Sequence, residues 1–543
     1  MSQPRIASDP FASLSPDVRR NMRFAMLEGS LSNVMGTLVG GAYLTGFALL
    51  LGAQDAHIGL LAAIPAFLNL TQIFGSILIR RFGSRRRLCL IAIGLSRTVW
   101  LSILSIPFWL IGDGFGDGRV WLLMAGIALV SLFSSAAGVA WLSWLTDLVP
   151  AEVRGRFNGK RSMYAGIAAM SAGLAGGPLI ELLGGRDVPS AFSAIFAIGV
   201  TFGFLALLAM ARITEPAMQE PAQSASFFKE IREPFRDKRF LSFSSFIIVW
   251  SFGVSIASPF FSVFMIRSLG VSFSLIALFG VASSVATILG MRLWGGVLDR
   301  IGPKPLLIVC GLGQACVPLA WLAAGPDNVT ALWVSHILGG FASAGTGLAN
   351  TAMLVQVSPS GNTAPYFGVH AALVGLAGAS APLVGGAAGA ILAGSVLSLG
   401  PVQFEGLRII FLISAAVRFL SLGLLARVDA GKRLEPEEIA ASLRRIQTRV
   451  PIFGVNQAVG FGLAAVENVN LSVARGSAAM ERWLEREIER GWQTLKRAKS
   501  AAERIDSKVD ARLARHEGRI DALIDRIIAV WERIRTLLRG RPR

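Results

Sequence analysis

The chain has 543 residues, of which 53% are hydrophobic and only 16% charged, and its formal net charge is +18. A mean hydropathy of +0.58 excludes a soluble fold of this length, because one water-facing core cannot bury so much apolar surface. Lipid is therefore the solvent for most of the chain, and a bundle of soluble helices or a nucleic-acid-binding surface is disfavoured.

The polar N-terminal segment 1–23 contains Arg19, Arg20 and Arg23 and precedes an apolar run too long for the core of a signal peptide. The first span is therefore expected to remain uncleaved. Twelve stretches in all reach the length of about 20 residues that crosses a bilayer. They begin near residues 25, 58, 88, 120, 161, 190, 240, 273, 305, 329, 366 and 406.

The spans divide into two sets of six, at residues 24–212 and 239–427. The connector 213–238 between them is rich in proline, glutamine and charge, as expected of a central cytoplasmic loop. A constant offset of 209 residues relates one proline and several glycines of the two sets, which indicates duplication. The matched pairs are Pro150 and Pro359, Gly159 and Gly368, Gly166 and Gly375, Gly176 and Gly385, and Gly177 and Gly386.

Basic residues collect in alternate turns, and this pattern predicts the orientation of the chain. Cytoplasmic loops of membrane proteins carry an excess of lysine and arginine. Both termini are therefore predicted to be cytoplasmic, in the inner or plasma membrane of a bacterium. The basic turns hold Arg80, Arg81, Arg85, Arg86 and Arg87, then Arg154, Arg156, Lys160 and Arg161, whereas the opposite turns hold little beyond Arg119, Arg186 and Arg267.

After residue 427 the composition becomes that of a water-soluble segment, with a linker at 428–474 and a tail at 475–543. Apolar residues of the tail recur every three or four positions from Ala502 to Leu537, which makes one stripe along a long cytoplasmic helix. A coiled coil that binds itself or a partner protein, a basic amphipathic helix on anionic lipid and a solvated helix all fit this stripe.

The most distinctive motif is a tight charged turn between two apolar runs, with Gly295, Asp299, Arg300, Gly302 and Lys304 in the pattern GxxxDRxGxKP. The carboxylate of Asp299 can cap a helix or pair with a basic group, and the two glycines permit close packing and a sharp reversal. This pattern resembles the loop signature of the major facilitator superfamily of secondary transporters. The resemblance covers about residues 20–430.

The resemblance implies an all-α membrane protein in which twelve transmembrane helices form two six-helix bundles that rock about a site near the bilayer midplane. It also implies that Asp299, Arg300 and Lys304 help to hold the cytoplasmic side closed in the outward-facing state.

The first half contains an imperfect copy of this turn, with Arg81, Gly83 and Arg85. It departs from the family pattern because Arg80 stands where the acid belongs. Gating in this half must therefore use another acid or be weaker, and Asp147 at the end of span 4 is the nearest candidate.

The turn that follows span 4 contains Arg154 and Arg156 and also resembles the family pattern. A solvated basic turn is the other interpretation of these two arginines.

Span 5 carries a fragment of the family's antiporter signature, Gly173, Gly177 and Pro178. Tyr164 stands in place of the first glycine of that signature. Glu181 is the first of the two residues that stand in place of its last two. Exchange of solute against protons and ordinary packing of small residues both fit this fragment.

The spans that line the cavity in the resembled fold supply candidate substrate contacts. Glu28 is the acid best placed to take a proton, although a local pair with Arg23 or Arg20 is the alternative. His336 can titrate near neutral pH or be a hydrogen-bonded core residue. Aromatic walls with few polar groups suit a neutral or cationic amphipathic solute, such as a drug. The further candidates are Asn33, Asn69, Gln72, Trp141, Trp144, Trp250 and Asn350.

Two arginines lie deep in the predicted spans, Arg97 in span 3 and Arg418 in span 12. Each is about 14 Å from the cytoplasmic end at the rise of a helix, which is too far for its charge to reach water comfortably. Structural pairing and a role in transport are the two interpretations.

Nothing in the sequence indicates catalysis. Cys89, Cys310 and Cys316 lie at or inside apolar segments and are too scattered for a disulfide framework or a metal cage. No Walker loop, catalytic triad or metal-ligand helix occurs as a motif. We therefore expect no enzyme, no cofactor and no bound metal.

Taken together, these patterns predict a membrane carrier that moves a small solute by alternating access, with the proton as the candidate coupling ion. A transport-inactive membrane scaffold or assembly factor that acts through the tail, and a mover of lipids, are the alternatives.

Overall fold

The computed structural model describes residues 14–109, 118–185, 187–217, 232–326, 328–359, 363–399 and 402–428. Ten of the helices in these ranges are long and apolar enough to cross a membrane. The predicted linker and tail, at 428–474 and 475–543, lie outside the described residues except for Val428.

The first half of the chain forms helices that begin within three residues of the predicted span starts, except that the first and fifth begin nine and ten residues earlier and the first two spans are broken. They are α1 (Pro16–Leu38), α2 (Gly41–Leu50), α3 (Asp55–Asn69), the 3₁₀-helix η1 (Leu70–Phe74), α4 (Gly75–Phe82), α5 (Arg85–Trp109), α6 (Gly118–Leu148), α7 (Ala151–Gly184) and α8 (Val188–Ala211).

The second half repeats this order. It contains η3 (Pro234–Arg236), α10 (Lys238–Ser255), α11 (Ser258–Val263), the π-helix η4 (Phe264–Ser268), α12 (Phe273–Ile301), α13 (Pro303–Leu322), α14 (Thr330–Val357), α15 (Ala364–Ile391) and α16 (Leu407–Ala426). A short antiparallel hairpin that the sequence did not predict, β1 (Val396–Leu399) and β2 (Val402–Glu405), precedes α16 and pairs Val396 with Glu405.

The predicted helical membrane fold is confirmed, whereas the predicted number of twelve spans is only partly supported. Two of the twelve apolar runs are not among the ten membrane-length helices. One is broken into α3, η1 and α4, and the other is α14, which carries His336, Asn350 and many small residues. The count of twelve therefore stays a prediction.

The basic turns follow from local chemistry. Gly83 ends α4 with φ +63° and Gly302 ends α12 with φ +77°, a left-handed backbone that glycine adopts without strain. The expectation that Gly295 permits close packing is wrong in this structure, because nothing lies within 4 Å of where its Cβ would be.

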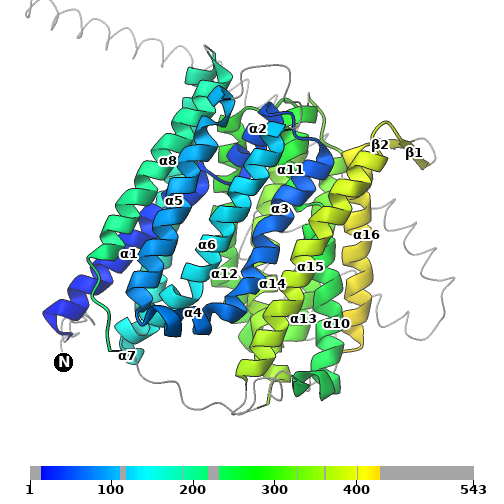
Figure 1. Ribbon diagram of the computed structural model, residues 1–543. Coiled ribbons are helices and arrows are strands. Elements are labelled where there is room, and N and C mark those ends of the chain that lie inside the picture. The colour runs from blue at the N-terminus through cyan, green and yellow to red at the C-terminus, as the bar shows by residue number, and fades with distance from the viewer. Residues whose placement is uncertain are drawn as a thin grey trace, which may run out of the picture. The chain divides into compact units, whose positions relative to one another are not determined.

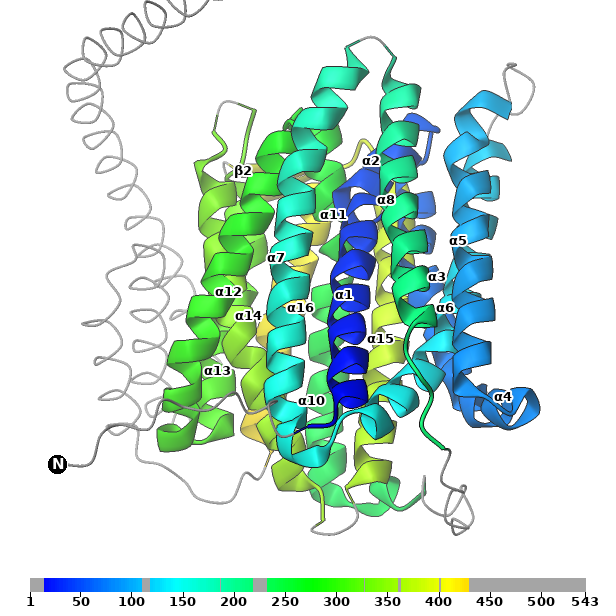
Figure 2. The same cartoon turned by 90° about the vertical axis from the view of Figure 1, so that its left-hand side faces the viewer.

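The two halves meet along two seams. α3 packs against α15, as Figure 1 shows, and α7 packs against α12, as Figure 2 shows. We call the end of the helices that carries the turns α4–α5, α6–α7 and α12–α13 the basic side, and the opposite end the far side.

The hydrophobic core is divided between these two sides. One cluster, which includes Phe47 of α2 and Phe260 of α11, draws on both halves and lies toward the far side. Two others each belong to one half and lie toward the basic side, around Trp144 and around Trp294. Among the described residues, the halves therefore share a core toward the far side and have separate cores toward the basic side. The domain limits predicted at 24–212 and 239–427 stay predictions.

Candidate substrate site and gates

The first half contains a buried ion pair between α1 and α7. Glu28, only 5% exposed, accepts a hydrogen bond from Ser32 Oγ at 2.9 Å and one from Arg161 Nη2 at 3.1 Å. The predicted local pair with Arg20 or Arg23 is wrong: Arg20 pairs with Asp17 instead. Arg161, which the sequence placed among residues of a basic turn, is thus a partly buried partner about three turns inside α7.

The Arg161 guanidinium lies between α1 and an aromatic ring. Its Nε donates to the carbonyl oxygen of Ala25 at 3.2 Å, and its central carbon lies 5.9 Å from the ring centre of Trp141. Gly29 makes room for it, since a Cβ there would lie 2.8 Å from the Arg161 Nε. The side chain is 27% exposed, so part of this guanidinium remains reachable.

Arg97 lies against α1 two turns beyond Glu28. A Cβ at Gly203 of α8 would lie 2.9 Å from the Arg97 Nε and closer still to the sulfur of Met35 in α1. The Arg97 Nε is buried and has no hydrogen-bond partner among the described residues. The first half therefore holds two arginines beside α1, Arg161 in contact with Glu28 and Arg97 next to Met35.

Arg418 differs from Arg97 because backbone carbonyls occupy its guanidinium. It is 4% exposed and donates from Nε to Gly253 O at 3.3 Å and from Nη1 to Gln314 O at 2.8 Å. Gly253 lies within one turn of the break between α10 and α11. These bonds support the structural interpretation of Arg418.

Three of the proposed aromatic and histidine contacts are core residues. Trp144 is fully buried and donates its indole N–H to Thr214 O at 3.2 Å, so the expectation that it lines a cavity is wrong. Trp250 is 7% exposed and stacks on Phe246. His336 is bonded through Nδ1 to Leu332 O at 2.8 Å, which matches the predicted core histidine.

The amides of the first half are accessible. Asn33 is exposed and donates to Gly29 O at 2.8 Å, next to the Arg161 contact. Asn69 and Gln72 are exposed where α3 gives way to η1, and Gln72 Nε2 lies 3.4 Å from Asn69 Oδ1. These residues do not touch the Glu28 cluster in any described bond.

Asn350 has a partner that the sequence analysis missed. Its amide nitrogen lies 3.5 Å from His370 Nε2, and the His370 ring stacks on Phe243. Asn350 Oδ1 and His370 Nδ1 are buried without hydrogen-bond partners among the described residues. A histidine inside an otherwise apolar span was the available sequence signal.

On the basic side, another segment of the first half supplies the acid that is missing from the turn with Arg81, Gly83 and Arg85. Arg85 is 2% exposed and forms an ion pair with Asp147, the acid predicted from the end of span 4. Arg85 also pairs with Glu215 at 3.3 Å, and its Nη2 donates to Pro216 O at 3.1 Å. This cluster holds the beginning of the central connector against α5 and α6.

Glu215 is a site residue that sequence reasoning missed. Its carboxylate caps the start of α5, accepting from Ser84 Oγ at 2.5 Å and from the backbone N–H groups of Arg85 at 2.8 Å and Arg86 at 3.3 Å. Partial burial alone would raise the pKa of Glu215. The hydrogen bonds from Ser84, Arg85 and Arg86 outweigh it and hold that pKa below its ordinary value.

The corresponding motif of the second half lies at the surface. Asp299 and Arg300 are exposed, and Asp299 has no hydrogen bond or ion pair with any described residue. Lys304 donates to Val428 O at 2.6 Å, at the end of α16.

The other basic-side arginines act within their own half. Arg154 donates to Thr146 O at 2.9 Å and Val149 O at 3.2 Å, where α6 ends, whereas Arg81 and Arg156 are exposed. The solvated interpretation of the turn therefore suits Arg156, and Arg154 caps a helix.

The far side carries charged bonds across both seams. Glu181 of α7 accepts from the backbone N–H of Ser274 at 2.9 Å, at the first turn of α12. Asp55 of α3 pairs with Arg267 of η4 at 2.7 Å. Phe273 stacks on Tyr43 with ring centres 5.9 Å apart.

The glycines matched at an offset of 209 make equivalent approaches at the two seams. A Cβ at Gly177 would lie 2.6 Å from Ser274 Cα, and one at Gly386 would lie 2.8 Å from Asp55 O. Small-residue packing therefore accounts for both glycines, including Gly177 of the antiporter fragment.

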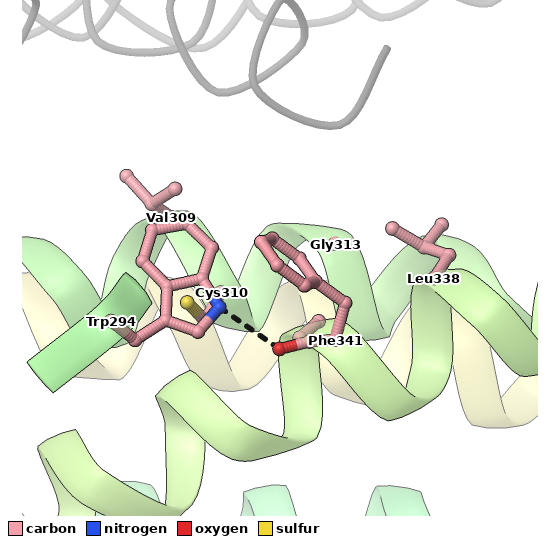
Figure 3. Close-up of a pocket in the computed structure, with 7 residues that line it drawn as sticks. Trp294, Val309, Cys310, Gly313, Leu338 and Phe341 are labelled. Carbon is pink, nitrogen blue, oxygen red and sulfur yellow. Dashed lines mark hydrogen bonds between the residues drawn. The ribbon is translucent and has the colours of Figure 1, made fainter. Parts of the chain in front are cut away.

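A small pocket between α12, α13 and α14 is apolar (Figure 3). Trp294 and Cys310 lie in it, and the Trp294 indole N–H donates to Phe341 O at 2.9 Å. It offers no free polar group for a solute. Within the described ranges, no three His, Cys, Asp or Glu side chains gather closely enough to hold a metal ion.

Comparison with known proteins connects this geometry to one family. The sequence pattern described as Major Facilitator Superfamily matches residues 29–256 and again residues 241–496. The first match begins in α1 and the second in α10, the first long helices of the two halves. No curated protein matches the sequence.

Solved transporters share the fold at low sequence identity. The nucleoside transporter NupG is 13% identical, with a TM-score of 0.57 over 77% of this chain and 100% of that protein. A D-xylose-proton symporter is 15% identical, with a TM-score of 0.58 over 77% of this chain and 100% of that protein. An inward-facing bacterial homologue of the human lysosomal transporter Spinster is 17% identical, with a TM-score of 0.54 over 78% of this chain and 100% of that protein.

Proposed function

Because the chain belongs to the major facilitator superfamily, we propose that this multi-pass membrane protein carries a small solute by alternating access between its two halves. The observation that carries the proposal is the contrast between the two sides. Charged bonds and a shared core join the halves on the far side, while Asp299 on the basic side has no described partner.

Alternating access requires a second state in which the contacts on the far side are broken and new contacts form on the basic side. The bonds of Glu181 to Ser274 and of Asp55 to Arg267 must break as the far side opens, and the turn at Asp299 must close on the first half. If the basic side is cytoplasmic, as the arginine distribution predicts, the present structure is the inward-facing state.

Glu28 is the proposed site of proton coupling. A carboxylate held against an arginine inside the helices can release that arginine when it is protonated, since the neutral acid no longer attracts the guanidinium. Arg161 is the group released. The sequence argument for antiport was the fragment with Gly177 and Pro178. Because close packing accounts for Gly177, the direction of coupling is not part of the proposal.

The test is transport by the full-length protein in liposomes with an imposed pH gradient. A dye inside the vesicles reports proton movement as solutes from a chemical library are added. We expect at least one solute to move protons through the wild-type protein and to fail with Glu28→Gln. A folded protein that moves no solute in either direction of the gradient would contradict the proposal.

The structure weakens the case for a scaffold. The turn that lacks an acid at Arg80 gains two from elsewhere, because Asp147 of α6 and Glu215 of the connector both pair with Arg85. No described feature favours a lipid mover. Deletion of residues 475–543 separates carrier from scaffold, because a carrier keeps its solute uptake without the tail.

A further inference from the structure

We propose that Arg161, Arg97 and Glu28 form a binding site for an organic anion, with Arg161 pairing with a carboxylate and Trp141 contacting the apolar body of the solute. This inference rests on the proposed transport function and names its solute class. It replaces the neutral or cationic solute that the sequence suggested.

The first step is the charge of the cluster. Two arginines and one carboxylate lie along this part of α1, because Glu28 contacts Arg161 at 3.1 Å and Arg97 lies beside Met35, two turns farther along the helix. The cluster therefore holds one excess positive charge inside the helices, where such a charge is strongly unfavourable. One monovalent anion would neutralise it. A cationic solute would add a third positive charge.

The second step is the hydrogen-bonding capacity left on the arginines. Arg161 uses Nε on Ala25 O and Nη2 on Glu28, and no described residue accepts from its Nη1. Its side chain is 27% exposed. Planar guanidinium groups bind carboxylates with paired, charge-assisted hydrogen bonds. Arg161 can thus receive a carboxylate oxygen without first losing its backbone contact.

The third step is the comparison of the two deep arginines. Arg418 is occupied by the carbonyls of Gly253 and Gln314, whereas Arg97 has a buried Nε with no described acceptor. Arg97 therefore keeps a positive charge inside the first half when the carboxylate of a solute takes over Arg161.

The last step is the apolar part of the solute. Trp141 is partly exposed, lies 5.9 Å from the Arg161 guanidinium and packs edge-on against the buried Trp144 at 5.3 Å. The ring is thus fixed beside the charged group. Exposed Asn33 follows Gly29 by one turn of α1 and adds an amide on the same wall. An aromatic or aliphatic carboxylate fits this combination.

The test uses three probes with the same ring and different charge: benzoate, benzyl alcohol and benzylamine. Thermal unfolding of the purified full-length protein in detergent reports binding, because a ligand of the folded state raises the midpoint. We expect benzoate to raise it at millimolar concentrations and the other two probes to have little effect. Greater stabilisation by benzylamine, or none by benzoate, would overturn the inference.

Variants locate the effect. Arg161→Gln should weaken benzoate binding about tenfold or more, and Arg161→Lys should weaken it less, because lysine keeps the charge but not the paired geometry. Arg23→Gln removes an exposed arginine from α1 and is the matched control, with benzoate binding unchanged. Unaltered benzoate binding in a folded Arg161→Gln protein would remove Arg161 from the site.

The inference and the proposed function fail in different ways. Proton-coupled uptake of neutral or cationic solutes, with no response to benzoate, would reject the anion site and leave the carrier standing. Benzoate binding that depends on Arg161, without uptake of any solute, would support the site and reject the carrier.

Discussion

The Glu181 carboxylate lies 2.9 Å from the backbone nitrogen of Ser274, so a residue at the end of α7 caps the first turn of α12 in the other half. A carboxylate at a helix N-terminus meets unpaired N–H groups and the positive end of the helix dipole. This bond ties the halves together on the far side and satisfies one of the free N–H groups at the start of α12.

Glu181→Ala is expected to shift the population toward the state that is open on the far side. Loss of about 1 kcal/mol corresponds to a roughly fivefold change in the ratio of the two states. Spin labels at Leu182 and Ile391, which are 76% and 77% exposed, measure the opening in a protein whose three native cysteines are replaced by alanine. Glu181→Gln keeps an acceptor and should shift the population less. An unchanged distance distribution in Glu181→Ala would show that the cap does not hold the far side.

The ion pair of Asp55 and Arg267 should contribute a smaller, salt-dependent term. Arg267 is 44% exposed, so screening by water limits the coupling to about 1 kcal/mol or less. A double-mutant cycle with Asp55→Asn and Arg267→Gln, measured by thermal unfolding at low and high salt, gives this coupling. Additive effects of the two substitutions at low salt would mean that the pair does not stabilise this state.

Arg85→Ala is expected to be among the more destabilising single substitutions on the basic side. The side chain is 2% exposed, and its removal leaves Asp147 and Glu215 without their shared cation. The expected loss is about 2–3 kcal/mol, less than for a wholly buried pair because Asp147 is 41% exposed. Thermal unfolding in detergent measures it. Arg81→Ala, four positions earlier and exposed, is the control and should change stability by about 0.5 kcal/mol at most.

The Glu215 cap predicts a specific acid sensitivity. Its pKa is lower in the folded protein than the ordinary value of 4.5, so the folded state gains stability from its ionised form at neutral pH. That stability is lost as the pH falls below about 4.5 and through the folded-state pKa. The unfolding midpoint of the wild-type protein should therefore fall more than that of Glu215→Gln as the pH is lowered from about 5 to about 3, which spans the ordinary pKa of a glutamate and the range below it. Parallel pH profiles would show that the cap is not energetically important.

Sequence reasoning identified Asp147 from the predicted topology, because spans 2 and 4 end on the same side of the membrane; its gating role stays a prediction. The absence of an acid at Arg80 pointed to Asp147, and the structure pairs Asp147 with Arg85. It failed where the partner came from a distant segment. Glu28 was expected to pair with an arginine of its own helix, but Arg161 arrives from α7, 133 residues later. Glu215 was missed for the same reason, since nothing beside it in the chain reveals the start of α5.

Side-chain direction was the other source of error. Trp141 and Trp144 are three residues apart on α6, and both were expected to face a cavity. Trp144 is buried against Thr214, while Trp141 lies over Arg161. The hydrophobic pattern of a membrane helix does not separate these faces, because lipid and protein interior are both apolar.

The sequence by itself determined the membrane solvent, the helical fold and the positions of the basic turns. These depend on properties of single segments: the apolar length that crosses lipid, the charge of a turn and the left-handed backbone at Gly83 and Gly302. Only the tertiary structure decided which charges meet, because burial of an ion pair depends on helices that lie side by side without being close in the chain. The bonds of Glu28 to Arg161 and of Glu181 to Ser274 are of this kind, and they carry the proposals for solute binding and for the gate.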